Sequence, residues 1–427
     1  MRYFRYSMFM YFVLLSFFES ILALPVQLKD CSADALQAAI FQAKEKTIIE
    51  LSCSQLQIDR QIFVDRPITI RGNKTVLDGG GRHRFFVVAK QTGWVIDGRL
   101  KPTAGQGGEG IHLQLENMIL RNGFSEQIPN GCSKKSICES GNKEVIEEGG
   151  AIYVGLWGHL SVKNVTFENN RSKSDGGAIY AHGGKSGTIN VSHSSFYNNR
   201  AGGGGGAIAV QALPELKIVQ SNFTGNQSEC TTDSCKTGER GAGAIRVWGS
   251  GLIIEKSNFT KNTGNLGGAI GSLQSWFQVS DSHFTDNHSG PGHIYKKNGN
   301  QVVLSDDKNS GSGTRGGGAI YADTGERERN YIITGSTFTN NSGPFDGGAL
   351  YLFMRKAEIE IKDCSFHGNT VAKTRGAAIA IYGKAKLVNL SFKENRALEK
   401  SKNKLGEKEI LFAPGAVMNG IKMQPLQ

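Results

Sequence analysis

A pair of short motifs recurs through residues 149–395. A Gly-Gly-Ala-Ile-like tetrapeptide is followed, 14 to 19 residues after its Ala, by Phe-x-x-Asn, and this order occurs eight times without interruption. The motif alanines are Ala151, Ala178, Ala207, Ala244, Ala269, Ala319, Ala349 and Ala378. The paired phenylalanines are Phe167, Phe196, Phe223, Phe259, Phe284, Phe338, Phe366 and Phe392. Because so short a unit cannot bury its apolar face alone, we expect the copies to stack into one continuous core.

Each residue type in the motifs has a physical role in such a stack. Apolar residues alternate with a period of two, which indicates short strands. Glycine permits tight corners, Ala and Ile fit a narrow interior, and Phe fills the rest of each rung. An Asn at the same corner of successive rungs can hydrogen-bond to its neighbours, so we expect a structural ladder of Asn170, Asn199, Asn226, Asn262, Asn287, Asn341, Asn369 and Asn395. The predicted fold is all-β, a single right-handed parallel β-helix, because the crossover rule favours that hand.

The first residues have the features of a secretory signal peptide. Arg2 and Arg5 precede an apolar run over residues 8–22, and Ala23 lies at the expected cleavage point. No later stretch approaches about 18 uninterrupted apolar residues, so no integral membrane segment is expected after signal removal. We predict a secreted, extracellular protein that could be retained at the cell surface.

The chain is expected to divide into four parts. They are a signal peptide (1–23), an N-terminal cap with the first rungs (24–148), the repeat β-helix (149–395) and a basic C-terminal tail or cap (396–427). Residues 32–44 place apolar side chains at helical spacing, with Ser32 or Asp34 able to cap the first turn. A short helix there would cover the exposed sheet edge of the first rung.

Two repeats are lengthened by insertions, at residues 227–241 and at residues 288–316. Such loops are where a solenoid can place function, and the second holds His293, Tyr295 and Lys296, which we take as candidate ligand-binding residues. The formal net charge is +11, but the basic residues are scattered along the repeats, so no nucleic-acid partner is expected.

Seven cysteines indicate an oxidising compartment. The candidate disulfides join Cys31 with Cys53, Cys132 with Cys138, and Cys230 with Cys235. Cys364 is then left alone beside a motif phenylalanine. No cysteine pair has the spacing of a zinc site, so neither a metal nor a cofactor is predicted.

The alternating motifs resemble the passenger repeats of the chlamydial polymorphic membrane proteins, within the pectate-lyase-like superfamily of right-handed parallel β-helices. The copies at residues 242–245 and 376–379 depart from the pattern. The resemblance implies an adhesive passenger at a cell surface. Members of that family carry an autotransporter barrel, whereas this sequence ends 32 residues after Asn395, so barrel anchoring is not expected here.

Aromatic side chains follow several motif alanines at a fixed spacing. Tyr153 and Tyr180 lie two residues after Ala on adjacent repeats, and Tyr321 and Tyr351 repeat the arrangement. If these four side chains face outward, they form stacked platforms for contact with a sugar or a protein; if they face inward, they are ordinary core.

The residues four after each motif alanine are expected to form one column of side chains, where catalytic groups could converge. The column reads Gly155, His182, Gln211, Trp248, Leu273, Asp323, Phe353 and Tyr382. His182 and Asp323 are four repeats apart, about 19 Å at one rung of about 4.8 Å per repeat, so they cannot act together. No catalytic residue is therefore predicted.

Ten Asn-x-Ser/Thr sequons are present, and two explanations of them stay open. They begin at Asn73, Asn164, Asn170, Asn190, Asn222, Asn226, Asn258, Asn287, Asn340 and Asn389. Some would carry glycans in a eukaryotic secretory pathway, but Asn-rich turns beside Ser, Thr and Phe also generate sequons by themselves.

The leading functional hypothesis is a secreted, non-enzymatic, adhesin-like β-helix that binds a cell-surface protein or polysaccharide. One alternative is a polysaccharide lyase or glycoside hydrolase that acts on an acidic polysaccharide, which the superfamily and the basic charge favour. Another is a structural coat or matrix protein.

Overall fold

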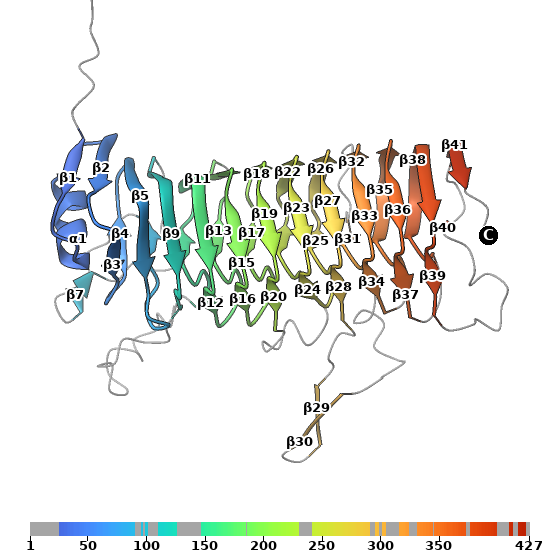
Figure 1. Ribbon diagram of the computed structural model, residues 1–427, viewed down its shortest axis with the longest axis horizontal. Coiled ribbons are helices and arrows are strands. Elements are labelled where there is room, and N and C mark those ends of the chain that lie inside the picture. Colours follow the sequence, from blue (N-terminus) through green and yellow to red (C-terminus); the bar gives the residue numbers. More distant parts are fainter. Residues whose placement is uncertain are drawn as a thin grey trace, which may run out of the picture.

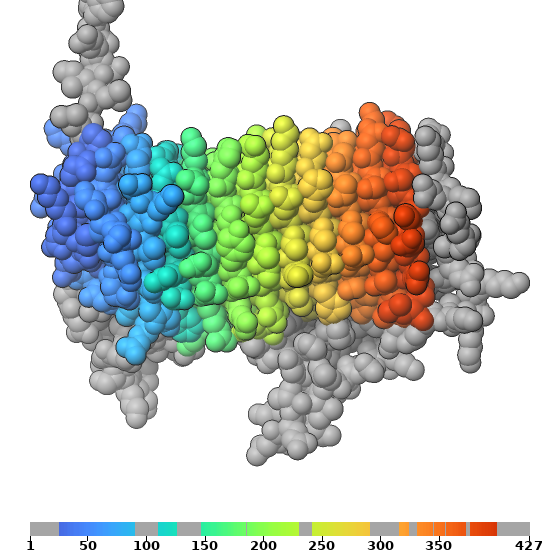
Figure 2. All heavy atoms as spheres, in the orientation of Figure 1, coloured from blue at the N-terminus to red at the C-terminus, as the bar shows by residue number. Residues whose placement is uncertain are grey.

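The described residues form an elongated stack of β-rungs (Figures 1 and 2). The computed structural model describes residues 25–89, 95–96, 99–100, 110–125, 147–184, 186–229, 241–290, 295–298, 301–304, 316–323, 331–344, 346–372, 376–398, 410–412 and 417–423. The predicted signal peptide and the cysteine pairs Cys132/Cys138 and Cys230/Cys235 lie outside these residues. Within the described residues, no helix is long and apolar enough to cross a membrane.

Each rung of the repeat region opens with a short strand that follows the Gly-Gly-Ala motif. The strands of this series pair in parallel and in register, so that Ile152 lies beside Ile179 and Ile179 beside Ile208. The series comprises β4 (Ile62–Val64), β6 (Phe86–Val88), β10 (Ile152–Val154), β13 (Ile179–His182), β17 (Ile208–Gln211), β21 (Ile245–Trp248), β25 (Ile270–Leu273), β31 (Ile320–Asp323) and the first residues of β35 (Leu350–Lys362) and β38 (Ile379–Lys393). We call its outward side the GGA face.

A second series of strands forms the middle face of the stack. It comprises β1 (Val26–Leu28), β2 (Thr47–Leu51), β14 (Thr188–Ser192), β18 (Glu215–Val219), β22 (Gly251–Glu255), β26 (Trp276–Ser280), β32 (Tyr331–Thr334), the central residues of β35 and β38, and the first residues of β5 (Ile68–Asp78), β9 (His112–Arg121) and β11 (His159–Glu168).

A third series, which contains the motif phenylalanines, forms the Phe face. It comprises β3 (Gln55–Gln57), β15 (Ser195–Tyr197), β19 (Asn222–Thr224), β23 (Asn258–Thr260), β27 (His283–Thr285), β33 (Thr337–Thr339), β36 (Ser365–His367) and the last residues of β5, β9, β11 and β38.

A fourth, short series closes each rung as an eight-stranded parallel sheet. Its members are β12 (Arg171–Ser172), β16 (Arg200–Ala201), β20 (Gln227–Ser228), β24 (Thr263–Gly264), β28 (His288–Ser289), β34 (Ser342–Gly343), β37 (Thr370–Val371) and β39 (Arg396–Ala397). These repeated parallel lanes confirm the predicted parallel β-helix.

The motif phenylalanines stack in one file through the interior. Neighbouring rings from Phe167 to Phe392 have centroids 4.6 to 5.2 Å apart and interplanar angles of 1 to 12°. All eight side chains are buried. This spacing is the distance between adjacent parallel strands, so the rings lie face to face because the backbone repeat places them there.

The predicted asparagine ladder is confirmed. In Asn199, the side-chain Nδ2 donates to the backbone oxygen of Phe167 (3.0 Å) and to Oδ1 of Asn226 (2.9 Å). Its own Oδ1 accepts from the backbone nitrogen and from Nδ2 of Asn170, both at 3.0 Å. The same pattern continues from rung to rung as far as Asn395. The ladder thus satisfies buried polar groups that the corner would otherwise leave unpaired.

A second ladder, which sequence analysis missed, consists of serines two residues before the motif phenylalanines. The hydroxyl of Ser221 accepts from the backbone nitrogen of Ser194 at 3.2 Å. The hydroxyl of Ser257 in turn accepts from the backbone nitrogen of Ser221 at 3.1 Å. Ser282 and Ser336 continue the series. Buried Cys364, a free cysteine, takes the place of serine on the following rung, and burial raises the pKa of its thiol to about 11.

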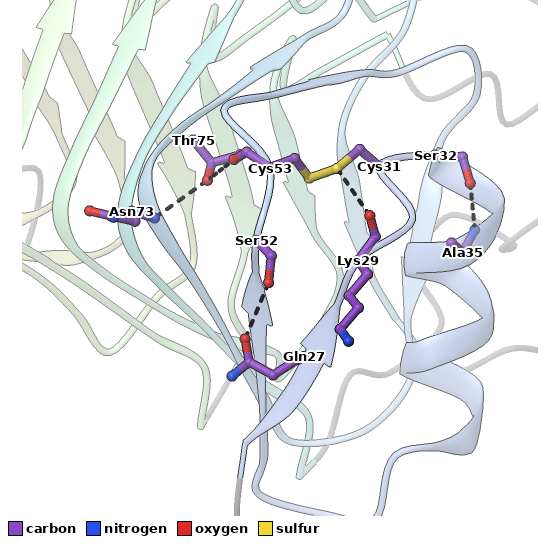
Figure 3. Close-up of a disulfide and its surroundings, with 9 residues drawn as sticks. All are labelled: Gln27, Lys29, Cys31, Ser32, Ala35, Ser52, Cys53, Asn73 and Thr75. Atoms are coloured by element: carbon purple, nitrogen blue, oxygen red, sulfur yellow. Dashed lines mark hydrogen bonds between the residues drawn. A yellow bond between two sulfur atoms is a disulfide. The ribbon is translucent and has the colours of Figure 1, made fainter.

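Helix α1 (Ala33–Gln42) caps the N-terminal end, as predicted. Ser32 is the N-cap, and its hydroxyl accepts from the backbone nitrogen of Ala35 at 3.1 Å. The buried side chain of Gln37 exchanges two hydrogen bonds with the backbone of Phe63 in β4, which occupies the open edge of the GGA series. The predicted disulfide between Cys31 and Cys53 is present and ties the start of the helix to the strand ladder (Figure 3).

The remaining strands lie outside these lanes or extend them. Two antiparallel hairpins, β7 (Val95–Ile96) with β8 (Arg99–Leu100) and β29 (Tyr295–Asn298) with β30 (Gln301–Leu304), fall between rungs in the sequence. At the C-terminal end, β40 (Ile410–Phe412) and β41 (Val417–Met423) pair with β38. Part of the segment predicted as a tail or cap therefore continues the stack.

Candidate functional site: the GGA face

The GGA face carries two rows of outward side chains. Strand alternation directs residues one and three after each motif alanine into the core, so residues two and four after it point outward. The inner row, two after the alanine, reads Tyr153, Tyr180, Ala209, Arg246, Gly271, Tyr321, Tyr351 and Ala380. The outer row, four after the alanine, contains His182, Gln211, Trp248, Leu273, Asp323, Phe353 and Tyr382 in register.

The candidate tyrosines lie on this face and not in the central core. The rings of Tyr153 and Tyr180 are stacked, with centroids 5.7 Å apart, and they belong to a separate buried apolar cluster on the outward side of the strands. Tyr321 and Tyr351 are stacked in the same way at 5.3 Å. Tyr153 is 5% exposed, Tyr180 8% and Tyr351 1%, whereas Tyr321 is half-buried. The rings are therefore stacked and outward, but three of the four are covered.

The buried side chain of Arg84 adjoins the first tyrosine pair. The Arg84 guanidinium donates to the backbone oxygens of Gly149 (2.7 Å) and Glu148 (2.5 Å), and lies 5.8 Å from the centre of the Tyr153 ring. Burial lowers the pKa of Arg84 to about 10, and burial raises the pKa of the Glu148 carboxyl. Arg84 thus bridges the turn before β10 to the aromatic stack.

A buried ion pair joins Arg246 on β21 to Asp175 in the turn before β13. Arg246 Nη1 lies 3.0 Å from Asp175 Oδ2, and the two side chains are 1% and 3% exposed. Asp175 Oδ1 also accepts from the backbone nitrogen of Gly204 at 2.7 Å. The arginine reaches back across β17, where the inner-row residue is the small Ala209.

The run of five glycines at residues 202–206 makes room for this ion pair. A Cβ atom at Gly204 would lie 2.5 Å from Cδ of Arg246, and one at Gly203 would overlap the Asp175 carboxylate. Sequence analysis missed the pair because Asp175 and Arg246 are 71 residues apart. The unusual glycine run beside a motif copy was the available signal.

The outer row supplies the more accessible side chains near this pair. His182, Gln211 and Trp248 are half-buried and stand on consecutive strands. The hydroxyl of Tyr180 donates to Oε1 of Gln211 at 3.5 Å, and the Arg246 guanidinium lies 5.1 Å from the Trp248 ring centre. Burial lowers the pKa of His182, which favours its neutral form. Neutral imidazole, amide and indole together present donors, acceptors and aromatic surface.

A second group of aromatic side chains gathers near the C-terminal end of the same face. The hydroxyl of Tyr382 donates to Asp346 Oδ2 at 2.8 Å. The Tyr382 ring centroid lies 5.4 Å from that of Tyr351 and 6.0 Å from that of Phe353. Gly271 and Leu273 on β25 separate this group from the first.

The other predicted site residues lie apart from these groups. His293 is outside the described residues, and Tyr295 and Lys296 belong to hairpin strand β29. His182 and Asp323 share the outer row but are four strands apart, as expected. Over the described part of the chain, no three His, Cys, Asp or Glu side chains come together as metal ligands.

The fold defines the class of the protein as a right-handed parallel β-helix, and two of its repeats are similar to those of the chlamydial polymorphic membrane proteins. Residues 222–397 match the family model described as "Right handed beta helix region". Residues 164–182 and 193–211 match the "Chlamydia polymorphic membrane protein (Chlamydia_PMP) repeat". No curated protein sequence matches the chain.

Solved structures that are similar to the chain include two alginate lyases and a phage tailspike protein. A PL6 alginate lyase in complex with a trisaccharide is 12% identical, with a TM-score of 0.40, and the match covers 93% of this chain and 96% of the lyase. An alginate lyase from Paenibacillus sp. str. FPU-7 is 10% identical, with a TM-score of 0.27 and coverage of 93% and 99%. Tailspike protein 3 of bacteriophage CBA120 is 12% identical, with a TM-score of 0.28 and coverage of 93% and 62%. At these identities, no residue role transfers to this chain.

Proposed function

We propose that this chain is a secreted, non-enzymatic β-helix protein that binds a cell-surface polysaccharide through the GGA face. The observation that carries the proposal is the concentration of aromatic and polar side chains there. The first group contains His182, Gln211 and Trp248, and the second contains Phe353 and Tyr382 beside Asp346. Aromatic surface next to hydrogen-bonding groups is the combination that sugar rings require.

The buried tyrosines of the inner row contact side chains of the outer row. Tyr153 and Tyr180 form a stacked base, and Tyr180 hydrogen-bonds to Gln211 in the outer row. In the second group, the Tyr351 ring lies against the Tyr382 ring, with centroids 5.4 Å apart. A side chain held by packing loses little conformational entropy when a ligand binds, so a rigid base favours affinity. In this proposal the outer row makes most of the direct contact, and half-buried Tyr321 adds to it.

The long insertion supplies a second candidate contact. Strands β29 and β30 pair with each other as a hairpin, and β29 contains Tyr295 and Lys296. Lysine and tyrosine are residue types that suit an acidic polysaccharide, because an ammonium group attracts carboxylates and an aromatic ring covers apolar sugar surface. Deletion of residues 291–315, which keeps β28 (His288–Ser289) and Gly316 in the stack, would separate this contribution from that of the GGA face.

Binding of the mature chain to glycan arrays and to cells tests the proposal. We expect Trp248→Ala to weaken binding at least about tenfold, which corresponds to about 1.4 kcal/mol. Lys217→Ala, a change on the middle face, is the matched control and should bind as the unaltered chain does. Absence of binding by the unaltered chain would refute the proposal. Release of unsaturated uronate products from alginate or pectin, seen as new ultraviolet absorbance, would replace it with the lyase alternative.

A further inference from the structure

The ten sequons fall into two structurally different sets. Asn170, Asn226 and Asn287 belong to the asparagine ladder and are 0% exposed. The other seven asparagines are exposed or half-buried: Asn73, Asn164, Asn190, Asn222, Asn258, Asn340 and Asn389. The repeat ladder therefore accounts for only the first set, and the second set needs another explanation.

The ladder asparagines have no free amide hydrogen to exchange for a sugar. Asn226 Nδ2 donates to the backbone oxygen of Phe196 at 2.9 Å and to Oδ1 of Asn262 at 3.0 Å. Asn170 and Asn287 use both of their amide hydrogens in the same way. A glycan at any of these positions would prevent the rungs from closing, because the site is buried and both donors are needed.

The seven outward asparagines avoid the GGA face. Asn190 lies on β14 of the middle face, and Asn222 and Asn258 are paired neighbours on β19 and β23 of the Phe face. The other four lie at corners. Asn164 and Asn389 adopt positive φ angles of 54° and 50° between the middle and Phe faces, Asn340 has a φ of 53° after β33, and Asn73 precedes the corner residue Lys74 in β5.

The strands of the GGA series carry no sequon asparagine, although they make up one lane of every repeat. At Asn73 the third sequon residue, Thr75, lies in β5 near the disulfide (Figure 3). Its hydroxyl donates to the backbone oxygen of Cys53 at 2.8 Å. The outward sequons thus extend from β5 to β38 along the middle face, the Phe face and the corners that adjoin the Phe face.

We propose that these seven outward asparagines are N-glycan acceptor sites, and that the glycans cover the middle and Phe faces and leave the GGA face bare. The donor is a lipid-linked oligosaccharide of the secretory pathway. The asparagine Nδ2 forms a bond to C1 of the first sugar, the bond from C1 to the oxygen of the lipid diphosphate breaks, and the amide loses one proton. The predicted signal peptide and the observed disulfide are consistent with passage through that pathway.

Expression of the full chain in a eukaryotic secretory host, followed by peptide mapping with and without peptide N-glycosidase, tests the assignment. We expect glycans on the outward set and none on Asn170, Asn226 or Asn287 in the secreted protein. A secreted protein whose mass the glycosidase leaves unchanged, or one with glycans on ladder asparagines, would overturn the proposal.

Asn222 and Asn226 form a matched pair within one rung. Asn222→Gln should remove one glycan and leave the denaturation midpoint of the deglycosylated protein unchanged. Asn226→Gln should leave the glycan count unchanged and lower that midpoint. The opposite pattern would show that the assignment of the two sets is wrong.

The bare GGA face can be probed separately, in a test that rests on the proposed function. Leu273→Asn creates a sequon with Gln274 and Ser275 on the outer row of that face. We expect this variant to gain one glycan and to lose polysaccharide binding at least about tenfold, which corresponds to about 1.4 kcal/mol. Leu273→Gln, which changes the same outer-row side chain without creating a sequon, should lose clearly less binding than the glycosylated variant. Peptide mapping could confirm the seven acceptor asparagines while the glycosylated Leu273→Asn variant still binds polysaccharide. That result would refute the GGA face as the binding surface and would leave the acceptor-site assignment intact.

Discussion

The Phe–Asn corner and the GGA face belong to the same rungs but differ in how strictly they repeat. At the corner, the same phenylalanine and the same asparagine return on every rung from Phe167 to Asn395, and each contacts its own copy. On the GGA face, the inner row passes from tyrosine to alanine, arginine and glycine within five strands. Identical residues are needed only at positions where a side chain packs against, or hydrogen-bonds to, the same side chain on the next rung.

The difference shows which positions are free to acquire a function. Inside the coil, a changed side chain would lose contacts above and below at once, because close packing leaves no space to adapt. Outside the coil, an outward side chain does not have to match its copy on the next rung, as the varied inner row of the GGA face shows. The comparison therefore predicts large stability effects at the corner and binding effects on the GGA face.

Removal of one ring from the phenylalanine file should have the largest effect on stability. Phe259→Ala should lower the free energy of unfolding by about 4 kcal/mol, since it leaves a cavity between two stacked rings. Thr260→Ala, one residue later and half-buried on the outside, should cost less than about 0.5 kcal/mol. Urea unfolding of both variants measures the difference, and equal costs would contradict a core-centred stack.

The buried ion pair is the place where the GGA face should behave like the interior. Arg246→Met should cost about 3 kcal/mol, because it leaves the Asp175 carboxylate buried without its guanidinium. Adding Asp175→Asn should recover much of that loss, since the amide keeps an acceptor for Gly204. A double-mutant cycle of unfolding free energies measures the coupling. Independent, additive costs would show that the pair does not act as a unit.

Removal of one asparagine from the ladder should lower the stability somewhat less than removal of one phenylalanine ring. Asn262→Ala should lower stability by about 2 kcal/mol, because the amide of Asn226 and the backbone oxygen of Phe223 lose their partners. Asn258→Ala removes an exposed asparagine on the same rung and should cost less than about 0.5 kcal/mol. Thermal denaturation of the two variants makes the comparison. Similar midpoints would refute a structural role for the ladder.

Protonation of the histidines should have the smallest effect on the free energy of unfolding. Burial lowers the pKa values of His112, His159, His182 and His288 from 6.5, so the folded state binds fewer protons than the unfolded state. Their contribution to stability is therefore complete above about pH 6.5 and is lost as the pH falls through the folded pKa values. Urea unfolding between about pH 8 and about pH 5 should show this loss, and His182→Gln should reduce it. A stability that rises on acidification in this range would contradict the assignment.

The sequence predicted most of the fold because its strongest signals are local and repeated. The spacing of Gly-Gly-Ala and Phe-x-x-Asn was sufficient for the parallel lanes, the ring file and the ladder, and the helix cap with its disulfide followed from short-range patterns. The serine ladder was also present as Ser two residues before Phe. It was missed because serine is common in turns.

The candidate site was less predictable. The spacing of Tyr153 and Tyr180 predicts that they share one column, but it leaves open whether the rings face inward or outward. In the structure the rings face outward and are nevertheless buried, a combination that the sequence did not predict. The contacts of Arg84 with Gly149 and of Arg246 with Asp175 span 65 and 71 residues. Pairs at that separation, without a repeat to relate them, leave no periodic trace in a single sequence.

The sequence by itself thus determined the coil, because each rung repeats the same local requirements and the next rung satisfies them. The tertiary structure alone decided which outward side chains are buried, which charges meet, and which sequon asparagines face solvent. Asn222 and Asn226 make the point within one rung: both begin sequons, and only the stacking of neighbouring rungs buries one and leaves the other accessible. The physical reason is that burial depends on the whole assembly of contacts, whereas conformational preference is a property of a few adjacent residues.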